Sequence, residues 1–450
     1  MPTHSSSESP RPKDLISASP LPWIVFLALI LSAAYAQTLH YQGARVTPPE
    51  DFQVFYVGAK IAAQGKRSLL YYAPGGRYTL SMIAEKTQEP GTLWDQVAQA
   101  SGLGATLHFC TPPFTALILE PLSHAPWSNA YMAWCWLSAL LLVASVYYTL
   151  RLARARPFWP MLAVFVAAGL AFFPYIQGLW LGQIDGLILV SWVLGTYLWS
   201  RGKPVSSAFC FAVGTMVKLT PALVAPLFLL RRQWRWLAAY CGWMAALAGV
   251  SIWRLGIENH IAWYRMVYPV LSCPVPYIEN RSLGSFLIAL YYGGVFLYNR
   301  IPQSIPGFVC LFAKTASAGA FLGALYLLWK RNRHSSGLAY ELVIMSVISL
   351  VVSPTSWRHY FVLTLLPLVY LWVVLLKSGE RSFELKLLAL VTLFFGLKIP
   401  EYLFFKFHLL SLIVPGSWVA ATFLLFWLCL RLYDPATAPQ IAAGGEARER

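Results

Sequence analysis

Long apolar segments, separated by short polar loops that carry most of the cations, run through almost the whole chain. A helix needs about 20 apolar residues to cross a hydrocarbon core about 30 Å thick. Short alternating segments of about 10 residues, which are typical of a membrane β-barrel, are absent from the sequence. The pattern therefore predicts an all-α polytopic membrane protein. About 10 full spans are expected, at residues 21–41, 127–150, 158–176, 184–200, 236–256, 306–329, 338–353, 360–376, 385–400 and 412–432.

Residues 204–230 do not fit this alternation, because they are too short for two full spans. A half-helix is predicted from Ser206 to Val217, and Thr220-Pro221 restarts the chain, since proline suits the first turn of a helix. A second half-helix follows. We predict a re-entrant helical hairpin with Lys218 at its tip. Non-helical backbone at membrane depth is tolerated only where it is buried or lines a cavity, so the tip is expected to line one.

Clusters of Arg and Lys at the ends of the spans indicate which side faces the cytoplasm. An even number of spans places both chain ends on that side. Residues 1–20 and 434–450 are of low complexity and are expected to form disordered cytoplasmic tails. Residues 21–433 then form one transmembrane domain, whose outer-face segments are residues 42–126 and 257–305.

Several shorter helices are predicted within the two outer-face segments. Apolar residues at helical spacing from Phe52 to Gln64 indicate an amphipathic helix on the membrane surface. Leu93 to Ala100 is a shorter candidate, and residues 283–298 form an aromatic, amphipathic piece. Residues 112–122 are apolar but too short to span.

The composition excludes some classes of function. The chain is 58% hydrophobic and 12% charged, and a soluble domain carries about twice that charged fraction. The net charge of +16 does not indicate nucleic-acid binding, because the cations lie in short loops between apolar segments. They act as topology signals and attract anionic membrane lipids. The seven cysteines are scattered without a CxxC pair, and we interpret them as small core residues.

Asp51 is the candidate general base. It follows Pro48, Pro49 and Glu50 directly after the first predicted span, and the prolines restrict the backbone that carries it. A base must be held within hydrogen-bonding reach of the proton that it takes. The alternative is that Asp51 caps the helix that begins at Phe52. Glu50 is a secondary candidate for substrate binding.

Three cations are candidates for binding a phosphate. Arg358 and His359 stand at an outer membrane face, where Arg can bind phosphate through two hydrogen bonds. Lys218 lies within an apolar segment, where a charge usually marks function. The alternatives are a solvated loop histidine and a structural ion pair of Lys218 with Asp185 or Glu120.

Four further polar or aromatic residues are candidate substrate contacts. Gln183 and Asp185 can bind sugar hydroxyls, although Asp185 also suits the start of a helix. Asn280 precedes Arg281 and Ser282, and this triplet can instead cap the following helix. Trp357 can be an interfacial anchor or a platform for a sugar ring. His108 and the Thr111-Pro112-Pro113 turn are expected to shape the wall of the outer pocket.

Neither a metal ion nor an organic cofactor is expected. The sequence has no HExxH, no Cys/His array, no DxD and no glycine-rich phosphate loop. An outward-facing enzyme without a nucleotide site needs an activated substrate that the membrane delivers. A polyprenyl-phosphate sugar meets this need, because its phosphate is the leaving group and cations can hold it.

Six motifs, in order along residues 20–430, resemble the GT-C superfamily of membrane glycosyltransferases. They look most like family 87, the polyprenol-phosphate-mannose-dependent α-mannosyltransferases that act on phosphatidylinositol mannosides. The motifs are Asp-Phe-x-x-Phe-Tyr at Asp51 to Tyr56, aromatic-x-x-Pro-Pro at Phe109 to Pro113, Gly-Gln-x-Asp at Gly182 to Asp185, Lys-x-x-Pro at Lys218 to Pro221, Asn-x-Ser-Leu at Asn280 to Leu283, and Ser-Pro-x-Ser-Trp-x-His at Ser353 to His359.

The resemblance implies an inverting transfer with Asp51 as general base, His359 near the donor phosphate and Tyr56 among the substrate contacts. It implies a hexose donor, with mannose expected first, a lipid-linked or glycan acceptor, and surrounding membrane lipids as partners. The expected location is the bacterial inner membrane, with the active site on the periplasmic side. Two departures stand out: Asp185 replaces an Asn that is common in the motif, and residues 85–105 form an insert. Arabinofuranosyl transfer and lipid or sugar transport remain alternatives.

Overall fold

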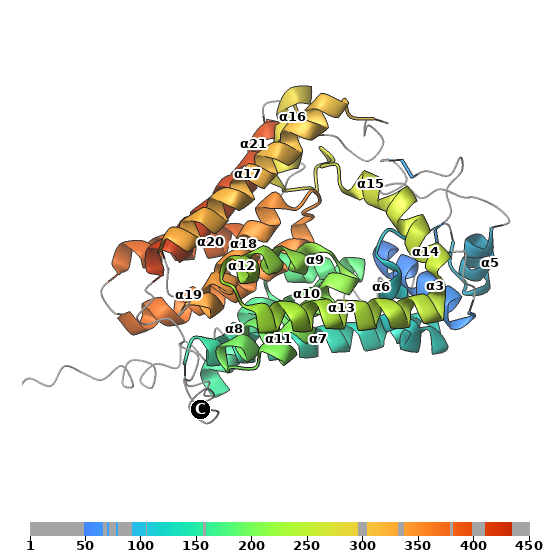
Figure 1. The fold of residues 1–450 in the computed structure, drawn as a ribbon, viewed down its shortest axis with the longest axis horizontal. Helices are drawn as coiled ribbons and strands as arrows, with labels where there is room; N and C mark the ends of the chain where they lie inside the picture. The colour runs from blue at the N-terminus through green and yellow to red at the C-terminus, as the bar shows by residue number, and fades with distance from the viewer. Residues whose placement is uncertain are drawn as a thin grey trace, which may run out of the picture.

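The computed structural model describes residues 49–65, 70–71, 78–79, 92–104, 106–155, 159–295, 304–331, 337–378, 381–397 and 410–433. Within these ranges the chain is almost entirely helical and contains no β-strand beyond one isolated bridge between Asn280 and Trp357 (Figure 1). The predicted first span at residues 21–41 and both predicted tails, 1–20 and 434–450, lie outside the described residues.

Five described helices are long and apolar enough to cross a membrane: Trp127–Leu152, Trp234–Leu255, Gly307–Arg331, Arg358–Lys377 and Leu412–Leu432. A sixth span results if α8 (Trp159–Leu170) and α9 (Phe173–Leu181), which are bent by 57° at their junction, count as one. The all-α polytopic architecture is therefore confirmed. The count of about 10 spans stays a prediction.

Two groups of helices build the body of the protein (Figure 1). In the first, α10 (Asp185–Ser200) packs between α7 (Trp127–Leu152) and α11 (Pro204–Val217), and α13 (Trp234–Leu255) packs on α11. In the second, α18 (Leu338–Val352) is buried along its whole length. Its neighbours include α17 (Gly307–Arg331), α19 (Leu365–Ser378) and α21 (Leu410–Leu432), while α20 (Ser382–Gly396) packs on α19 and α21 and α16 (Leu283–Tyr292) on α17.

The first outer helix, α3 (Glu50–Ala63), occupies the predicted position but does not lie on the surface. Ten of its 14 residues are buried, because α5 (Leu93–Ala100), α6 (Pro113–Ile118) and the 3₁₀ turn η2 (Glu120–His124) pack around it. The prediction of a surface amphipathic helix is therefore wrong for this segment. Helical spacing shows that a segment is helical but not how many of its faces are covered.

The helix break at Lys218 falls where the sequence predicts it. After α11, Lys218 adopts an extended backbone with φ −156° and ψ 126°. The chain then continues through a 3₁₀ turn, η3 (Thr220–Val224), into α12 (Ala225–Leu230). Whether these two arms form a re-entrant hairpin in the bilayer stays a prediction.

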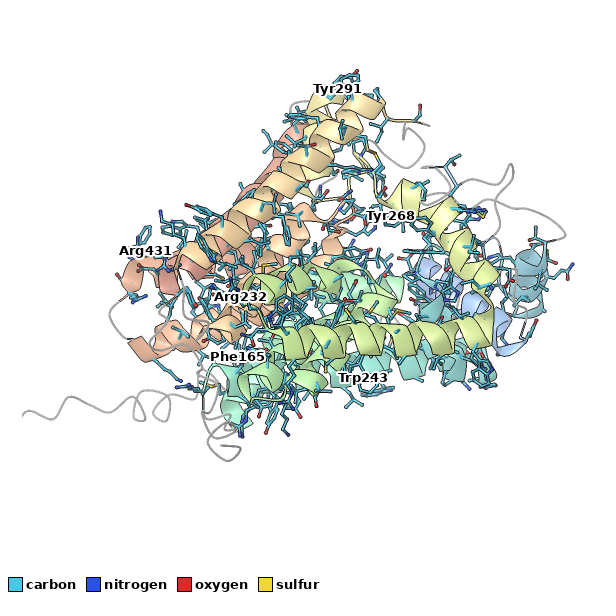
Figure 2. All side chains as sticks on the ribbon, in the orientation of Figure 1. Phe165, Arg232, Trp243, Tyr268, Tyr291 and Arg431 are labelled. Atoms are coloured by element: carbon cyan, nitrogen blue, oxygen red, sulfur yellow. A yellow bond between two sulfur atoms is a disulfide. The ribbon has the colours of Figure 1, made fainter. Side chains whose placement is uncertain are left out.

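The helix ends divide into a basic end and a polar end. Arg151, Lys203, Arg232, Lys330 and Arg431 stand at or beside one end of α7, α11, α13, α17 and α21. Figure 2 labels Arg232 and Arg431 on that side of the body, away from Tyr268. The opposite, polar end carries the start of α10, the end of α11 and the end of α18. The polar sequence motifs therefore lie on the side away from the basic clusters.

Two cysteines are joined in a disulfide, which contradicts their interpretation as small core residues. Cys273 and Cys310 are bonded across 37 positions of sequence. Cys273 follows the short helix α15 (Tyr268–Leu271), and Cys310 lies in the first turn of α17. The bond ties an outer-face segment to the polar end of a candidate span.

Candidate active site

A cavity of about 480 Å³ opens at the polar end of the helices. Its walls come from segments that are far apart in sequence. The start of α3 and residues 107–112 form one wall, as expected for His108 and the Thr111-Pro112 turn. The remainder of the wall comes from the α9–α10 junction, the break after α11, residues 352–360 and residues of the segment 263–279. The predicted site residues that line it are Glu50, Asp51, Gln183, Lys218, Trp357 and His359.

Asp51 is held by a hydrogen bond from Gln183. Helix α3 begins at Glu50 with Pro49 as its N-cap residue, and no side chain caps it, so the capping hypothesis for Asp51 is wrong. Instead, Nε2 of Gln183 donates to Oδ2 of Asp51 at 2.7 Å. This approach depends on Gly182, whose φ is +74° and whose missing Cβ would lie 3.1 Å from the Cα of Phe52.

The environment of Asp51 keeps its carboxyl group easier to protonate than an ordinary aspartate. Burial raises the pKa of Asp51 above its usual value, because it disfavours the charged form. The positive charge of His359 and the hydrogen bond from Gln183 act in the opposite direction and lower this pKa. A carboxylate that is partly desolvated and kept in place by one amide has the character of a general base.

Asp185 joins the two basic side chains that face the cavity. Its Oδ1 accepts a hydrogen bond from Nζ of Lys218 at 2.8 Å, and its Oδ2 contacts Nδ1 of His359. The ammonium of Lys218 also stands over the ring of Tyr360, 2.9 Å from the ring centre. Asp185 is only 5% exposed and does not line the cavity. The expected ion pair of Lys218 with Asp185 is therefore present. The geometry does not place Asp185 in direct contact with a substrate in the cavity.

His359 is a buried residue, not a solvated loop histidine. It is 4% exposed and belongs to the 3₁₀ segment η6 (Arg358–Thr364). Because Asp185 accepts at Nδ1, this nitrogen carries a proton and Nε2 is left for other contacts. The alternative of a solvated histidine is wrong.

Arg358 points to a carboxylate instead of the cavity. Its Nε and Nη2 both contact Glu279, in the two-pronged arrangement that suits guanidinium and carboxylate. Nε2 of Gln177 donates to the same carboxylate at 3.2 Å. Glu279 and Gln177 line the cavity, whereas Arg358 does not. The predicted direct phosphate contact of Arg358 is thus replaced by an ion pair behind the wall.

Asn280 and Tyr56 lie behind the cavity walls. Asn280 is fully buried, and its amide nitrogen donates to Pro354 O at 2.9 Å while Oδ1 accepts from Ser356 N at 2.9 Å. The amide thus connects two loops at the polar end. The expected helix cap is supplied by Ser282, which accepts from Ser285 N at 3.1 Å. The hydroxyl of Tyr56 donates to Ala125 O at 2.7 Å.

Several cavity residues are absent from the sequence prediction. Gln177 is a single amide in an apolar segment, which is a usable but weak signal. Tyr277 packs edge-on against Trp357, with ring centres 5.3 Å apart. Trp263 donates from Nε1 to Cys110 O at 3.1 Å. Both aromatic residues look like ordinary interfacial residues in sequence, because nothing in their local pattern marks them as pocket residues.

The chain matches glycosyltransferase family 87 over residues 109–354. It is 25% identical over 348 residues to a polyprenol-phosphate-mannose-dependent alpha-(1-2)-phosphatidylinositol pentamannoside mannosyltransferase of Mycobacterium tuberculosis (strain CDC 1551 / Oshkosh), covering 73% of this chain and 72% of the relative. The Mycolicibacterium smegmatis protein of the same description is 25% identical over 304 residues, 65% of this chain and 67% of the relative. The match covers more than half of the sequence and includes the α9–α10 junction, Lys218 and Asn280, so this chain belongs to glycosyltransferase family 87.

Proposed function

We propose that the protein transfers a hexose from a polyprenyl-phosphate sugar to a hydroxyl group of a membrane-bound acceptor, with inversion at the anomeric carbon. One observation carries the proposal. A carboxylate, Asp51, and two basic side chains, Lys218 and His359, come from three distant parts of the chain and line one cavity. Transfer needs a base for the acceptor proton and positive charge for the leaving phosphate.

Asp51 takes the proton of the acceptor hydroxyl in this proposal. The hydrogen bond from Gln183 uses Oδ2, so we assign proton abstraction to Oδ1. As the proton leaves, the acceptor oxygen forms a bond to the anomeric carbon, and the bond from that carbon to the phosphate oxygen breaks. Attack on the face opposite to the phosphate inverts the configuration.

Lys218 and His359 hold the departing polyprenyl phosphate. Asp185 bonds to both side chains and keeps them on the same side of the cavity. Negative charge that develops on the leaving phosphate is stabilised most by cations that are already in place. Arg358 is assigned to the wall, because its ion pair fixes Glu279 at the cavity edge.

Mannose and a glycolipid acceptor are the first choices for the substrates. The relatives from Mycobacterium tuberculosis and Mycolicibacterium smegmatis are described as polyprenol-phosphate-mannose-dependent phosphatidylinositol pentamannoside mannosyltransferases. Two observations support an active site on the periplasmic side of a bacterial inner membrane. The cavity lies at the end opposite to the basic helix termini, and the Cys273–Cys310 disulfide is on the cavity side, as oxidising compartments favour.

A donor screen tests this function. Purified protein in lipid nanodiscs is supplied with mannosyl, glucosyl or arabinofuranosyl polyprenyl phosphate together with a membrane glycolipid fraction. The expected result is acceptor-dependent release of polyprenyl phosphate from the mannosyl donor and an inverted linkage in the product. The Asp51→Asn protein is the control. Turnover of the arabinofuranosyl donor alone would replace hexose transfer by arabinofuranosyl transfer, and movement of donor without bond cleavage would indicate a transporter.

A further inference from the structure

A helical segment at the rim of the cavity has a surface that the catalytic proposal does not use. Residues 257–271, here called the outer arm, consist of α14 (Ile257–Ala262), a π-helical turn η4 (Trp263–Val267) and α15. The arm turns away from the end of α13 at Gly256, whose φ is +81°. In Figure 1 it runs back from there towards α16 and α17. It therefore bridges the polar ends of two candidate spans.

The inward face of the arm is fully built into the protein. Oδ1 of Asn259 accepts from Leu70 N at 3.3 Å, and His260 contacts Ser251 Oγ through Nε2 at 3.0 Å. Trp263 is hydrogen-bonded to Cys110, as described above, and lines the cavity together with Tyr268 and Leu271. One face of the arm is thus a cavity wall.

The outward face is an apolar stripe. Ile257, Ile261 and Tyr264 follow each other at intervals of four and three residues, and they are 45%, 43% and 64% exposed. The rings of Tyr264 and Tyr268 stack with centres 5.6 Å apart. Single exposed apolar side chains are ordinary, but a continuous stripe along one helical face calls for an apolar partner.

The position of the arm indicates which partner covers this stripe. Its first residue follows the end of α13, and its last turn is fixed to α17 by the Cys273–Cys310 disulfide and by Lys314, which donates to Ser272 Oγ at 3.3 Å. Both anchors are ends of candidate membrane spans. A segment anchored at the ends of two spans is expected at the level of the lipid headgroups. Tyrosine is favoured there, and the exposed Arg265 and Lys314 offer positive charge to lipid phosphates.

We infer that the outer arm lies in the headgroup region of the outer leaflet, with the stripe of Ile257, Ile261 and Tyr264 in contact with lipid. The arm then separates the bilayer from the cavity, because its other face carries Trp263 and Leu271. In combination with the proposed function, this arrangement means that the acceptor is a membrane-anchored lipid that enters beside the arm from the leaflet. A free, water-soluble glycan acceptor would gain no access to the cavity from an arm that lies in the leaflet.

Photocrosslinking tests the position of the arm independently of catalysis. A benzophenone amino acid replaces Tyr264 in the full chain, which is placed in nanodiscs of phosphatidylethanolamine and phosphatidylglycerol. Irradiation is expected to give protein–lipid adducts at this position. Trp243, which is 36% exposed in the middle of α13, is the positive control, and Gln99, on the exposed face of α5, is the negative control. Lipid adducts at Trp243 but none at Tyr264, or adducts between protein chains at Tyr264, would overturn the inference.

Kinetics test the role of the arm in access. The double variant Ile261→Asp/Tyr264→Asp changes two side chains that do not line the cavity. The KM for a long-chain acceptor in vesicles should rise at least about tenfold, since apolar contact with the leaflet is lost. The kcat, the donor KM and the turnover of a short-chain, water-soluble acceptor should stay within about twofold of the wild-type values. The variant Ile261→Leu/Tyr264→Phe should behave like the wild type.

Two outcomes separate this inference from the proposed function. An equal loss of turnover with long-chain and short-chain acceptors would overturn the access role of the arm. If the wild-type protein transfers no sugar from any polyprenyl-phosphate donor, the proposed function fails, while the lipid adducts at Tyr264 still decide whether the arm lies in the leaflet.

Discussion

Two buried ion pairs at opposite ends of the helices resemble each other chemically but differ in their surroundings. At the basic end, Arg231 donates from Nε to Glu341 at 3.0 Å and from Nη2 at 2.5 Å, and it also donates to Leu328 O at 2.9 Å. The hydroxyl of Tyr433 donates to the same carboxylate at 3.3 Å. No member of this group lines the cavity.

At the polar end, Asp185 is also buried, but its two partners face a cavity. Lys218 and His359 each use part of their hydrogen-bonding capacity on Asp185 and present the remainder to that space. The comparison shows that a buried charge does not by itself mark a functional site. A closed network contributes to stability or uniqueness of the fold, whereas a network beside a cavity can act on a ligand.

The largest effect on turnover is expected for Asp51, which has no counterpart at the basic end. Asp51→Asn should lower kcat by at least about 10²-fold, because the amide cannot accept the acceptor proton. The amide keeps the shape of the carboxyl group, so the Tm and donor binding should be unchanged. Turnover within threefold of the wild type would contradict the assignment of Asp51 as base. Product formation from the mannosyl donor is the measurement.

Breaking the closed pair should affect stability instead of turnover. Glu341→Ala leaves Arg231 buried without its carboxylate, which is expected to cost about 3–5 kcal/mol of unfolding free energy. Turnover per folded molecule should not change. The control is Glu384→Ala, since Glu384 pairs with the half-exposed Arg431 and water screens such a pair, so its loss should change the unfolding free energy little. Thermal unfolding in detergent, followed by assay of the monodisperse fraction, separates the two effects. A fall in kcat for folded Glu341→Ala protein would remove the distinction between the two ends.

Removing the cation at the polar end should act on the donor. Lys218→Ala is expected to raise the donor KM by roughly 10- to 100-fold, the range for losing a charged hydrogen bond. The acceptor KM should stay the same. Lys60→Ala is the matched control, because Lys60 lies over the Tyr56 ring away from the cavity. An increase of the acceptor KM alone would show that Lys218 serves the other substrate.

Much of the site is predictable because its chemistry is local in sequence. Thr220-Pro221 predicts the helix break that places Lys218 at the cavity. Pro49 predicts the fixed start of the helix that carries Asp51. The partnerships between distant residues are harder. Asp185 is a possible partner of Lys218 in sequence, but its simultaneous contact with His359 depends on how α10 meets η6. Arg358 looks like a phosphate ligand in the sequence, but the fold pairs it with Glu279.

The fold departs from the sequence prediction where the role of a residue depends on its burial and on contacts with residues distant in sequence. Helical spacing locates α3 but cannot show that neighbouring helices cover all its faces. Cys273 and Cys310 belong to no sequence motif. They pair because the fold brings the end of α15 beside the start of α17. Asn280 has the residue type of a sugar ligand, yet its amide is used by two loops. In each case the missing information is three-dimensional contact.

A smaller effect is expected for the carboxylate behind the cavity. Asp185→Asn keeps the shape and one oxygen acceptor but removes the charge that both Lys218 and His359 contact. A loss of about tenfold in kcat/KM for the donor is expected, because a charged hydrogen bond becomes a neutral one. The Asn side chain at this place is common in the family motif, so the variant should fold. Unchanged donor kinetics would show that Asp185 has only the structural role that Glu341 has at the basic end.

The finest test uses pH, because burial raises the pKa of Asp51 while the hydrogen bond from Gln183 lowers it. A base must be unprotonated, so kcat/KM should fall as the pH drops through this raised pKa. The acid limb is therefore expected above pH about 3.9, the ordinary value for Asp. Gln183→Ala removes the lowering contribution, so the limb should move to higher pH. His359, Glu50 and Asp185 also act on the Asp51 charge and are unchanged in this variant.

Gln177→Ala is the matched control for that shift. Gln177 is also an amide on the cavity, but it donates to Glu279 and not to Asp51. Its removal should leave the acid limb of the pH profile where it is, even if kcat changes. Equal displacement of the limb in both variants, or none in Gln183→Ala, would mean that the titrating base is not Asp51. The measurement is kcat/KM for the acceptor against pH at saturating donor, which reports the pKa of the base before the acceptor binds.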